Sequence, residues 1–128
     1  MTPRPALSPV FAAAVAAALL APSTVIVTAA ADHPPGEKVH GQPAAAAVDE
    51  NDQLQFQPVT VKVGREGVVQ WTNSGVVDHN VTFDPYPGLT SGTMHHGDRY
   101  EIRFTAPGTY QYRCTFHPGM TGTVDVSP

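Results

Sequence analysis

The sequence predicts an all-β protein with a Greek-key β-sandwich or barrel of about seven to eight strands. Hydrophobic residues recur at every second position in several short runs, which is the pattern of strands that bury one face. Glycine, proline and asparagine separate these runs, and such turn residues at regular spacing are typical of sandwiches and barrels. No run has the period of an amphipathic helix.

The first 31 residues are expected to be a secretory signal peptide. Arg4 is their only charged residue, residues 10–21 are almost wholly apolar, and residues 29–31 offer a small-residue cleavage site. An uncleaved membrane anchor is the alternative, because apolar residues resume after residues 22–24. The continuous run is nevertheless shorter than the about 20 residues that span a bilayer. A cleaved signal implies a periplasmic or extracellular protein without stable membrane insertion.

Residues 32–43 are expected to be a flexible linker, since they are rich in proline and glycine and have no hydrophobic period. His33 would stand third in the mature chain if cleavage followed Ala30, and an amino-terminal histidine at that position can bind Cu(II). An incidental linker histidine is the preferred interpretation, for His33 and for His40. The folded domain is then expected at residues 44–128.

Alternation of apolar and polar residues predicts the strands of this domain. The run at residues 99–104 alternates three apolar residues with Arg99, Glu101 and Arg103 on the opposite face. After the pattern turns to period two near residue 44, the main runs are residues 59–63, 69–72, 79–83, 99–104, 110–114 and 124–126.

Charge and cysteine content narrow the functional classes. The whole chain has a net charge of −4, and removal of residues 1–31 takes away only Arg4 among its charged residues. An acidic domain is poorly suited to nucleic acid and is expected to be a soluble monomer. Cys114 is the only cysteine, so it forms no internal disulfide. Because a free thiol is a liability in an oxidising compartment, ligation to a metal is favoured.

The strongest chemical signal is the run from Cys114 to Met120. It contains a thiolate, the imidazole of His117 and a thioether with the spacing Cys-x2-His-x2-Met. Two His and one Cys with a weak axial Met form the blue-copper arrangement. His79 is the best candidate for the second imidazole, because it opens the alternating run at residues 79–83. One type 1 copper ion is therefore the expected cofactor.

Other interpretations of the same residues are weaker. A lone cysteine in a core strand is more often a small buried hydrophobe. Structural zinc sites usually use paired clusters of Cys and His and do not use Met. A dinuclear copper–thiolate centre requires a second cysteine, which the sequence lacks.

Residues 49–128 resemble the cupredoxin family of type 1 blue copper proteins. The resemblance rests on residues 61–64 (VKVG), 69–73 (VQWTN), 79–81 (HNV) and 107–114 (PGTYQYRC), and on HP at residues 117–118 followed by Met120. The short His-x2-Met spacing is most similar to the amicyanin group, with pseudoazurin and plastocyanin further off. The resemblance implies that His79, Cys114 and His117 are the equatorial ligands and that Met120 is the axial ligand.

The resemblance also implies roles for neighbours of these ligands. Asn80 would hydrogen-bond across to the ligand loop near Thr115. His117 would be the electron port, because its ring edge reaches solvent in such loops while the upstream histidine stays buried. Phe116, Pro118 and residues 85–87 form either an apolar docking collar or ordinary loop packing.

The expected function is that of a one-electron carrier between protein redox partners, without enzymatic activity. An enzyme would need further copper sites and an open ligand position. A copper-binding protein for delivery or storage is the alternative, and its support is limited to His33, His40, His95 and His96. His95 and His96 lie in the long loop at residues 84–98 and are expected to face solvent rather than form a second metal site.

Overall fold

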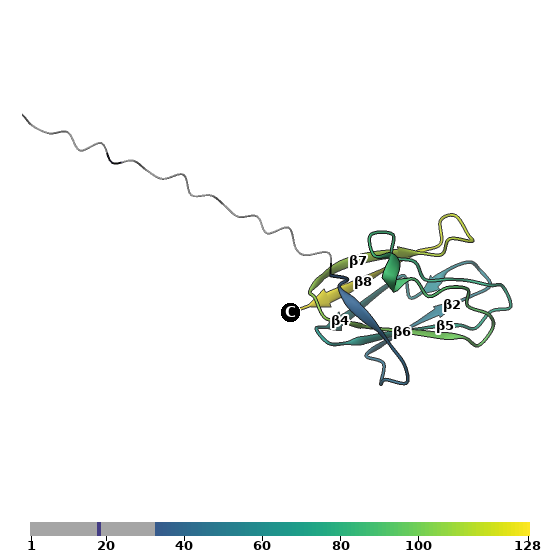
Figure 1. Cartoon of the computed structure of the whole chain (residues 1–128). Helices are drawn as coiled ribbons and strands as arrows, with labels where there is room; N and C mark the ends of the chain where they lie inside the picture. The colour runs from purple at the N-terminus through teal and green to yellow at the C-terminus, as the bar shows by residue number, and fades with distance from the viewer. Residues whose placement is uncertain (1–17, 19–32) are drawn as a thin grey trace, which may run out of the picture. The chain divides into compact units, whose positions relative to one another are not determined.

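Residues 33–128 fold into eight strands arranged in two sheets (Figure 1). The computed structural model describes residue 18 and residues 33–128, so the signal peptide expected at residues 1–31 lies outside the described residues apart from one position. The first sheet has the order β1-β6-β5-β2-β3, with β1 at Gly36–Val39, β2 at Ala46–Glu50, β3 at Phe56–Gln57, β5 at Val68–Asn73 and β6 at Arg99–Phe104. The second has the order β4-β8-β7, with β4 at Thr60–Gly64, β7 at Gly108–Arg113 and β8 at Thr121–Ser127.

One short 3-10 helix, η1 at Pro87–Leu89, interrupts the long connection between β5 and β6. Among the described residues, no helix combines the length and the apolar character needed to cross a membrane.

The two sheets stack face to face around an apolar core. Strand alternation supplies that core: in β4, Val61 and Val63 are buried while the residues between and beside them are exposed. Trp71 is fully buried, and its ring packs against those of Phe83 and Tyr112. β2 pairs with β5, and β4 with β8, in parallel. Since parallel neighbours are never joined by a tight hairpin, the chain crosses between the two sheets. The prediction of an all-β sandwich is confirmed.

Strand β1 lies within the segment that was expected to be a linker. Gly36 to Val39 pair antiparallel with β6, and the chain then crosses the outer face of the first sheet before β2 begins (Figure 1). This crossing buries Glu101, which accepts hydrogen bonds from Gln42 N–H and Gln70 Nε2. The expectation of an irregular linker is therefore corrected at residues 36–39, where this short edge strand shows no hydrophobic period.

Residues 79–83 do not form the strand that their alternation predicts. Two isolated bridges hold this segment instead, one from His79 to Met94 and one from Thr82 to Arg113. Because these partners belong to different parts of the chain, no continuous ladder can form. The segment therefore runs beside the end of β7 and brings residue 79 toward the loop that follows β7.

Candidate metal centre

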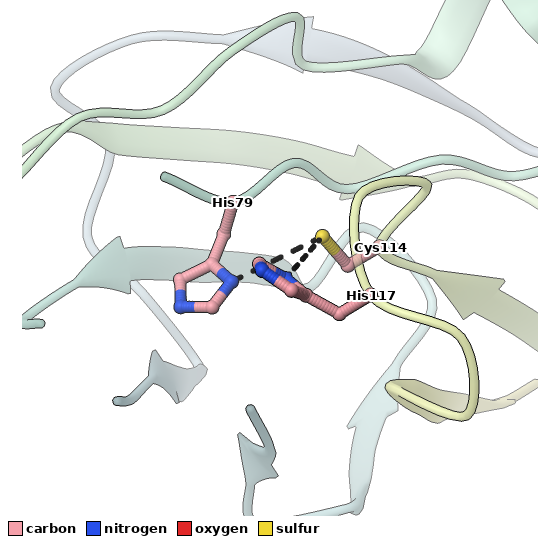
Figure 2. Close-up of side chains that lie close together, drawn as sticks. All are labelled: His79, Cys114 and His117. Atoms are coloured by element: carbon pink, nitrogen blue, oxygen red, sulfur yellow. Dashed lines mark hydrogen bonds between the residues drawn. The ribbon is translucent and has the colours of Figure 1, made fainter. Parts of the chain in front are cut away.

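Three side chains with metal-binding atoms converge beside the loop that joins β7 to β8 (Figure 2). One ligand atom from each of His79, Cys114 and His117 lies within 4.8 Å of the other two. The distance to Cys114 Sγ is 3.9 Å from His79 Nδ1 and 3.5 Å from His117 Nδ1. In the described part of the chain, this is the one group of at least three His, Cys, Asp or Glu side chains close enough to hold a metal ion.

These separations fit one shared ion. Metal–nitrogen bonds of about 2.0 Å and metal–sulfur bonds of about 2.3 Å, the values known for zinc, place ligand atoms about 3.5 to 3.7 Å apart around one ion. The observed 3.5 and 3.9 Å lie close to this range. Two imidazoles and a thiolate are also the donor set of the equatorial plane in a type 1 copper site.

A hydrogen bond from its far nitrogen orients His79. The ring is fully buried, and Nε2 lies 3.0 Å from the carbonyl oxygen of Asn51. Because a carbonyl oxygen only accepts, Nε2 carries the proton, and the lone pair of Nδ1 is free on the side of Cys114. Burial lowers the pKa of His79 below its ordinary value, against a smaller raising effect of the Asn51 hydrogen bond. Burial thus favours the neutral form that metal binding requires.

Asn80 connects the His79 segment to the ligand loop. Its Nδ2 donates to Thr115 Oγ1 at 2.6 Å, and its Oδ1 accepts the backbone N–H of Thr115 at 3.0 Å. Oδ1 also accepts the hydroxyl of Thr82 at 3.1 Å. The hydrogen bonding of Asn80 to the loop at Thr115, which the resemblance implied, is confirmed.

Met120 lies where the loop closes. Its side chain is buried in the same apolar cluster as Cys114. The carbonyl oxygen of Met120 accepts the N–H of Cys114 at 3.0 Å, and its own N–H donates to the carbonyl of His117 at 3.1 Å. Gly119 permits this reversal with a φ of +85°, a conformation that side chains with a Cβ rarely adopt. The loop therefore holds its thiolate, imidazole and thioether residues at one end of the sandwich.

The outer side of the centre is open to solvent and carries exposed apolar side chains beside the carboxylate of Asp78. His117 is partly exposed, in contrast to the fully buried His79. A shallow hollow beside His117 is lined by Val76, Val77, Asp78 and Phe116. Val76 is 81% exposed and Phe116 is 47% exposed. Among the described residues, the other exposed large apolar side chains are Leu54 and Val59, so two of the four gather beside His117.

Residues 85–87 do not line this hollow. The ring of Tyr86 instead packs 6.2 Å from that of Tyr110 on β7, and η1, which starts at Pro87, contacts β1. The structure thus shows packing contacts for Tyr86 and η1, and the apolar side chains beside His117 come from Val76, Val77 and Phe116 instead.

His95 and His96 are exposed, as expected for the loop before β6. His95 Nδ1 lies 2.8 Å from a carboxylate oxygen of Asp78, and this hydrogen bond raises the pKa of His95. His96 Nδ1 donates to the carbonyl oxygen of Gly75 at 2.8 Å. Met94, by contrast, is a core residue. Neither histidine belongs to a metal cluster within the described residues.

Asn51 is a site residue that the sequence patterns did not single out. Its Oδ1 accepts the N–H groups of Gln53 and Gln55, each at 3.1 Å, which holds the turn between β2 and β3. Its carbonyl accepts both His79 Nε2 and the N–H of Leu54. An asparagine after an alternating run does indicate a turn, but the contact with residue 79 follows only from the way the sheet is assembled.

Comparison with known proteins agrees with this geometry. The model of a family described as "Copper binding proteins, plastocyanin/azurin family" matches residues 43–127. The chain belongs to this family. Copper is therefore its cofactor, and the resemblance to cupredoxins is confirmed.

Individual members of the plastocyanin/azurin family support the assignment. Amicyanin-alpha of Methylorubrum extorquens is 38% identical over 94 residues, which cover 70% of this chain and 79% of that protein. Plastocyanin of Scenedesmus fuscus is 32% identical over 85 residues, with coverages of 57% and 87%. A solved structure of an oxidised amicyanin variant has a TM-score of 0.65 and 26% identity, and covers 73% of this chain and 100% of its own.

Proposed function

We propose that this chain is a one-electron carrier that holds a single type 1 copper ion through His79, Cys114, His117 and Met120. The observation that carries the proposal is the convergence of two imidazole nitrogens on one thiolate sulfur. Copper, when bound, supplies the Cu(II)/Cu(I) couple. Met120 contributes an axial thioether from the closing turn of the loop.

The surroundings of the ligands favour electron transfer over catalysis. Hydrogen bonds from Asn51 and Asn80 hold the His79 segment and the ligand loop in one arrangement. Ligands held by such hydrogen bonds keep a similar geometry in both oxidation states of the copper, which suits rapid exchange of an electron. Four protein ligands leave no open position for a substrate, so we propose no enzymatic activity.

Copper delivery or storage is the weaker candidate. It would require ligands that capture and release the ion readily, and His95 and His96 are its main support in the folded domain. Their Nδ1 atoms are engaged with Asp78 and Gly75. No specific observation therefore favours this candidate over electron transfer.

We place electron entry and exit at His117. Its partly exposed ring is bordered by the hollow that contains Val76 and Phe116. A small apolar contact of this kind suits the weak, short-lived encounters of an electron carrier with protein redox partners. The signal peptide expected at residues 1–31 would put these encounters in the periplasm or outside the cell.

The first test is the absorption spectrum of the purified full chain with one equivalent of copper. We expect intense visible absorption from copper–thiolate charge transfer that bleaches with ascorbate and returns with an oxidant. Cys114→Ser should abolish the colour, and His95→Gln, a change in an exposed histidine, should leave it intact. Absence of the colour, or colour that survives Cys114→Ser, would contradict the proposal.

The second test concerns the electron port. His117→Gly should slow electron self-exchange by a large factor, because it removes the ligand that reaches the surface, and added imidazole should restore the colour. The exchange rate can be measured by NMR line broadening in mixtures of oxidised and reduced protein. An unchanged rate would show that electrons enter elsewhere.

A further inference from the structure

Glu50 is a buried carboxyl group with no role in the metal centre described above. It ends β2, and its exposed fraction is 0%. Neither side-chain oxygen has a hydrogen-bonding partner among the described residues. Val48 and Glu50 are the buried residues of this strand, so strand alternation directs the carboxyl group into the core. Burial without a partner strongly disfavours a charged carboxylate.

Two other buried polar groups accompany it. Trp71 Nε1 and Tyr112 Oη also lack hydrogen-bonding partners within the described part of the protein. The rings of Trp71 and Tyr112 are 5.3 Å apart. Phe56, which stands opposite Glu50 in the pairing of β2 with β3, has its ring 4.7 Å from that of Tyr112. Burial chiefly raises the pKa of Tyr112, a smaller effect of Trp71 lowers it, and a negative charge on Glu50 raises it by a still smaller amount.

Two residues of this polar cluster are close in sequence to residues of the metal centre. Asn51 follows Glu50 directly, and its carbonyl oxygen accepts the ring N–H of His79. Tyr112 precedes Cys114 by two positions, and both are buried. Asn51 therefore links the backbone of Glu50 to a proposed copper ligand, and the fully buried carboxyl group of Glu50 is shielded from solvent.

No cation forms an ion pair with Glu50 in the part of the chain that the structure describes. Its neighbour on β2, Asp49, is acidic. The strands that contact β2 contribute buried side chains that carry no positive charge, namely Phe56 on β3, Val61 and Val63 on β4, and Val68, Val69, Trp71 and Asn73 on β5. Burial raises the pKa of Glu50 from 4.5 to about 8, with a smaller contribution from Asp49. The carboxyl group is thus mostly protonated at neutral pH.

We propose that Glu50 is a proton-binding site linked to the copper centre, which takes up one proton when the copper is reduced and releases it when the copper is oxidised. The linkage rests on the proposed electron-carrier function. One electron from the redox partner reduces Cu(II) to Cu(I), and one proton from solvent binds a side-chain oxygen of Glu50. A buried carboxylate attracts the extra positive charge of Cu(II), so oxidation favours its ionised form and reduction favours its protonated form.

The first arm of the test uses the metal-free protein and needs no copper chemistry. The carboxyl carbon of Glu50, observed by carbon-13 NMR, should titrate with a midpoint near pH 8. Because this pKa is raised on folding, the stability associated with it is complete below about pH 4.5 and is lost as the pH rises to about 8. Glu50→Gln should remove this slope in the free energy of unfolding.

Glu101→Gln is the matched control. Glu101 is also a buried glutamate of the first sheet, but its oxygens accept hydrogen bonds from Gln42 and Gln70. This variant should retain the titration of Glu50 and the associated slope. A Glu50 midpoint at the ordinary value for glutamate would overturn the proposal without bearing on the metal centre.

The second arm measures the reduction potential of the copper protein by voltammetry between pH 7.5 and 9.5, above the range in which unperturbed histidines titrate. The wild-type potential should shift downward as pH rises, and Glu50→Gln should lose this shift and keep the higher value. A wild-type potential independent of pH would overturn the linkage. A chain that shows the Glu50 titration but binds no copper would instead overturn the proposed function, and the linkage with it.

Discussion

At the scale of single residues, the geometry of the centre depends on hydrogen bonds that neighbouring residues make to the proposed ligands and to the ligand loop. The Asn51 carbonyl selects which nitrogen of His79 faces the sulfur. The amide of Asn80 bonds to Thr115 with both its oxygen and its nitrogen. Such partners orient the ligands, and their loss typically lowers metal affinity by about 10- to 100-fold. Substitutions at these positions should therefore alter the centre without removing a ligand.

Asn80→Ala tests this at the residue scale. It leaves the N–H and hydroxyl of Thr115 without their partner, so the free energy of unfolding of the metal-free protein should fall by about 1–3 kcal/mol. The ligand loop should also release copper to a chelator more rapidly. Chemical denaturation measures the first effect, and the loss of visible absorption after addition of a chelator measures the second.

Thr109→Val is the control for that substitution. It removes a hydrogen bond between side chains, from Thr109 to Asp125, that lies on the exposed surface far from the ligand loop. Its effect on the free energy of unfolding should stay within about 0.5 kcal/mol. Equal effects of the two variants would mean that the buried hydrogen bonds of Asn80 add no more stability than an exposed one.

Strand β1, which the sequence patterns did not predict, changes both the edge and the outer face of the first sheet. It extends the first sheet beyond β6, and Glu37 forms an ion pair with Arg103 across the new edge at 2.9 Å. The close approach of β1 to β6 requires glycine at position 36, because a Cβ there would lie 2.6 Å from the carbonyl oxygen of Arg103. The strand and the crossing that follows it then cover Glu101.

Gly36→Ala should therefore displace β1. We expect a loss of about 1–3 kcal/mol in the free energy of unfolding, the usual cost of overpacking, and faster hydrogen exchange at residues 36–39. The copper colour should persist, because the ligands belong to other elements. Gly88→Ala is the control, since a Cβ at that position meets nothing within 4 Å. If both variants behave like the wild type, β1 adds no stability.

The metal centre joins distant parts of the molecule at the scale of the whole domain. His79 belongs to the segment that bridges to Met94, before β6 of the first sheet, whereas Cys114 and His117 follow β7 of the second. The pair His79 and Cys114 is separated by 35 positions in sequence. A bound ion would thus cross-link segments that the metal-free protein connects by hydrogen bonds and packing.

Removal of copper should therefore lower the thermal unfolding midpoint. Free copper at about 1,000 times its dissociation constant would stabilise the folded state by about 4 kcal/mol. Calorimetry with and without copper measures this difference. Cys114→Ser, which removes the proposed thiolate ligand, should show a much smaller shift, and an equal shift in both proteins would place the copper elsewhere.

Local patterns were sufficient to predict the fold class, most strands and the candidate ligands. Alternation reports which face of a strand is buried, and the donor types of Cys114, His117 and Met120 are properties of single side chains at short spacing. The same reasoning failed at residues 79–83 and at residues 36–39, since the period of a segment does not encode its pairing partners.

The sequence by itself thus determined an all-β sandwich and a cysteine–histidine–methionine loop suited to copper. The tertiary structure decided that His79 reaches the sulfur of Cys114, that Asn51 orients its ring, and that Glu50 lies buried without a partner. The physical reason is that alternation and side-chain chemistry are local, whereas these contacts exist only after strands distant in sequence have paired and the two sheets have packed together.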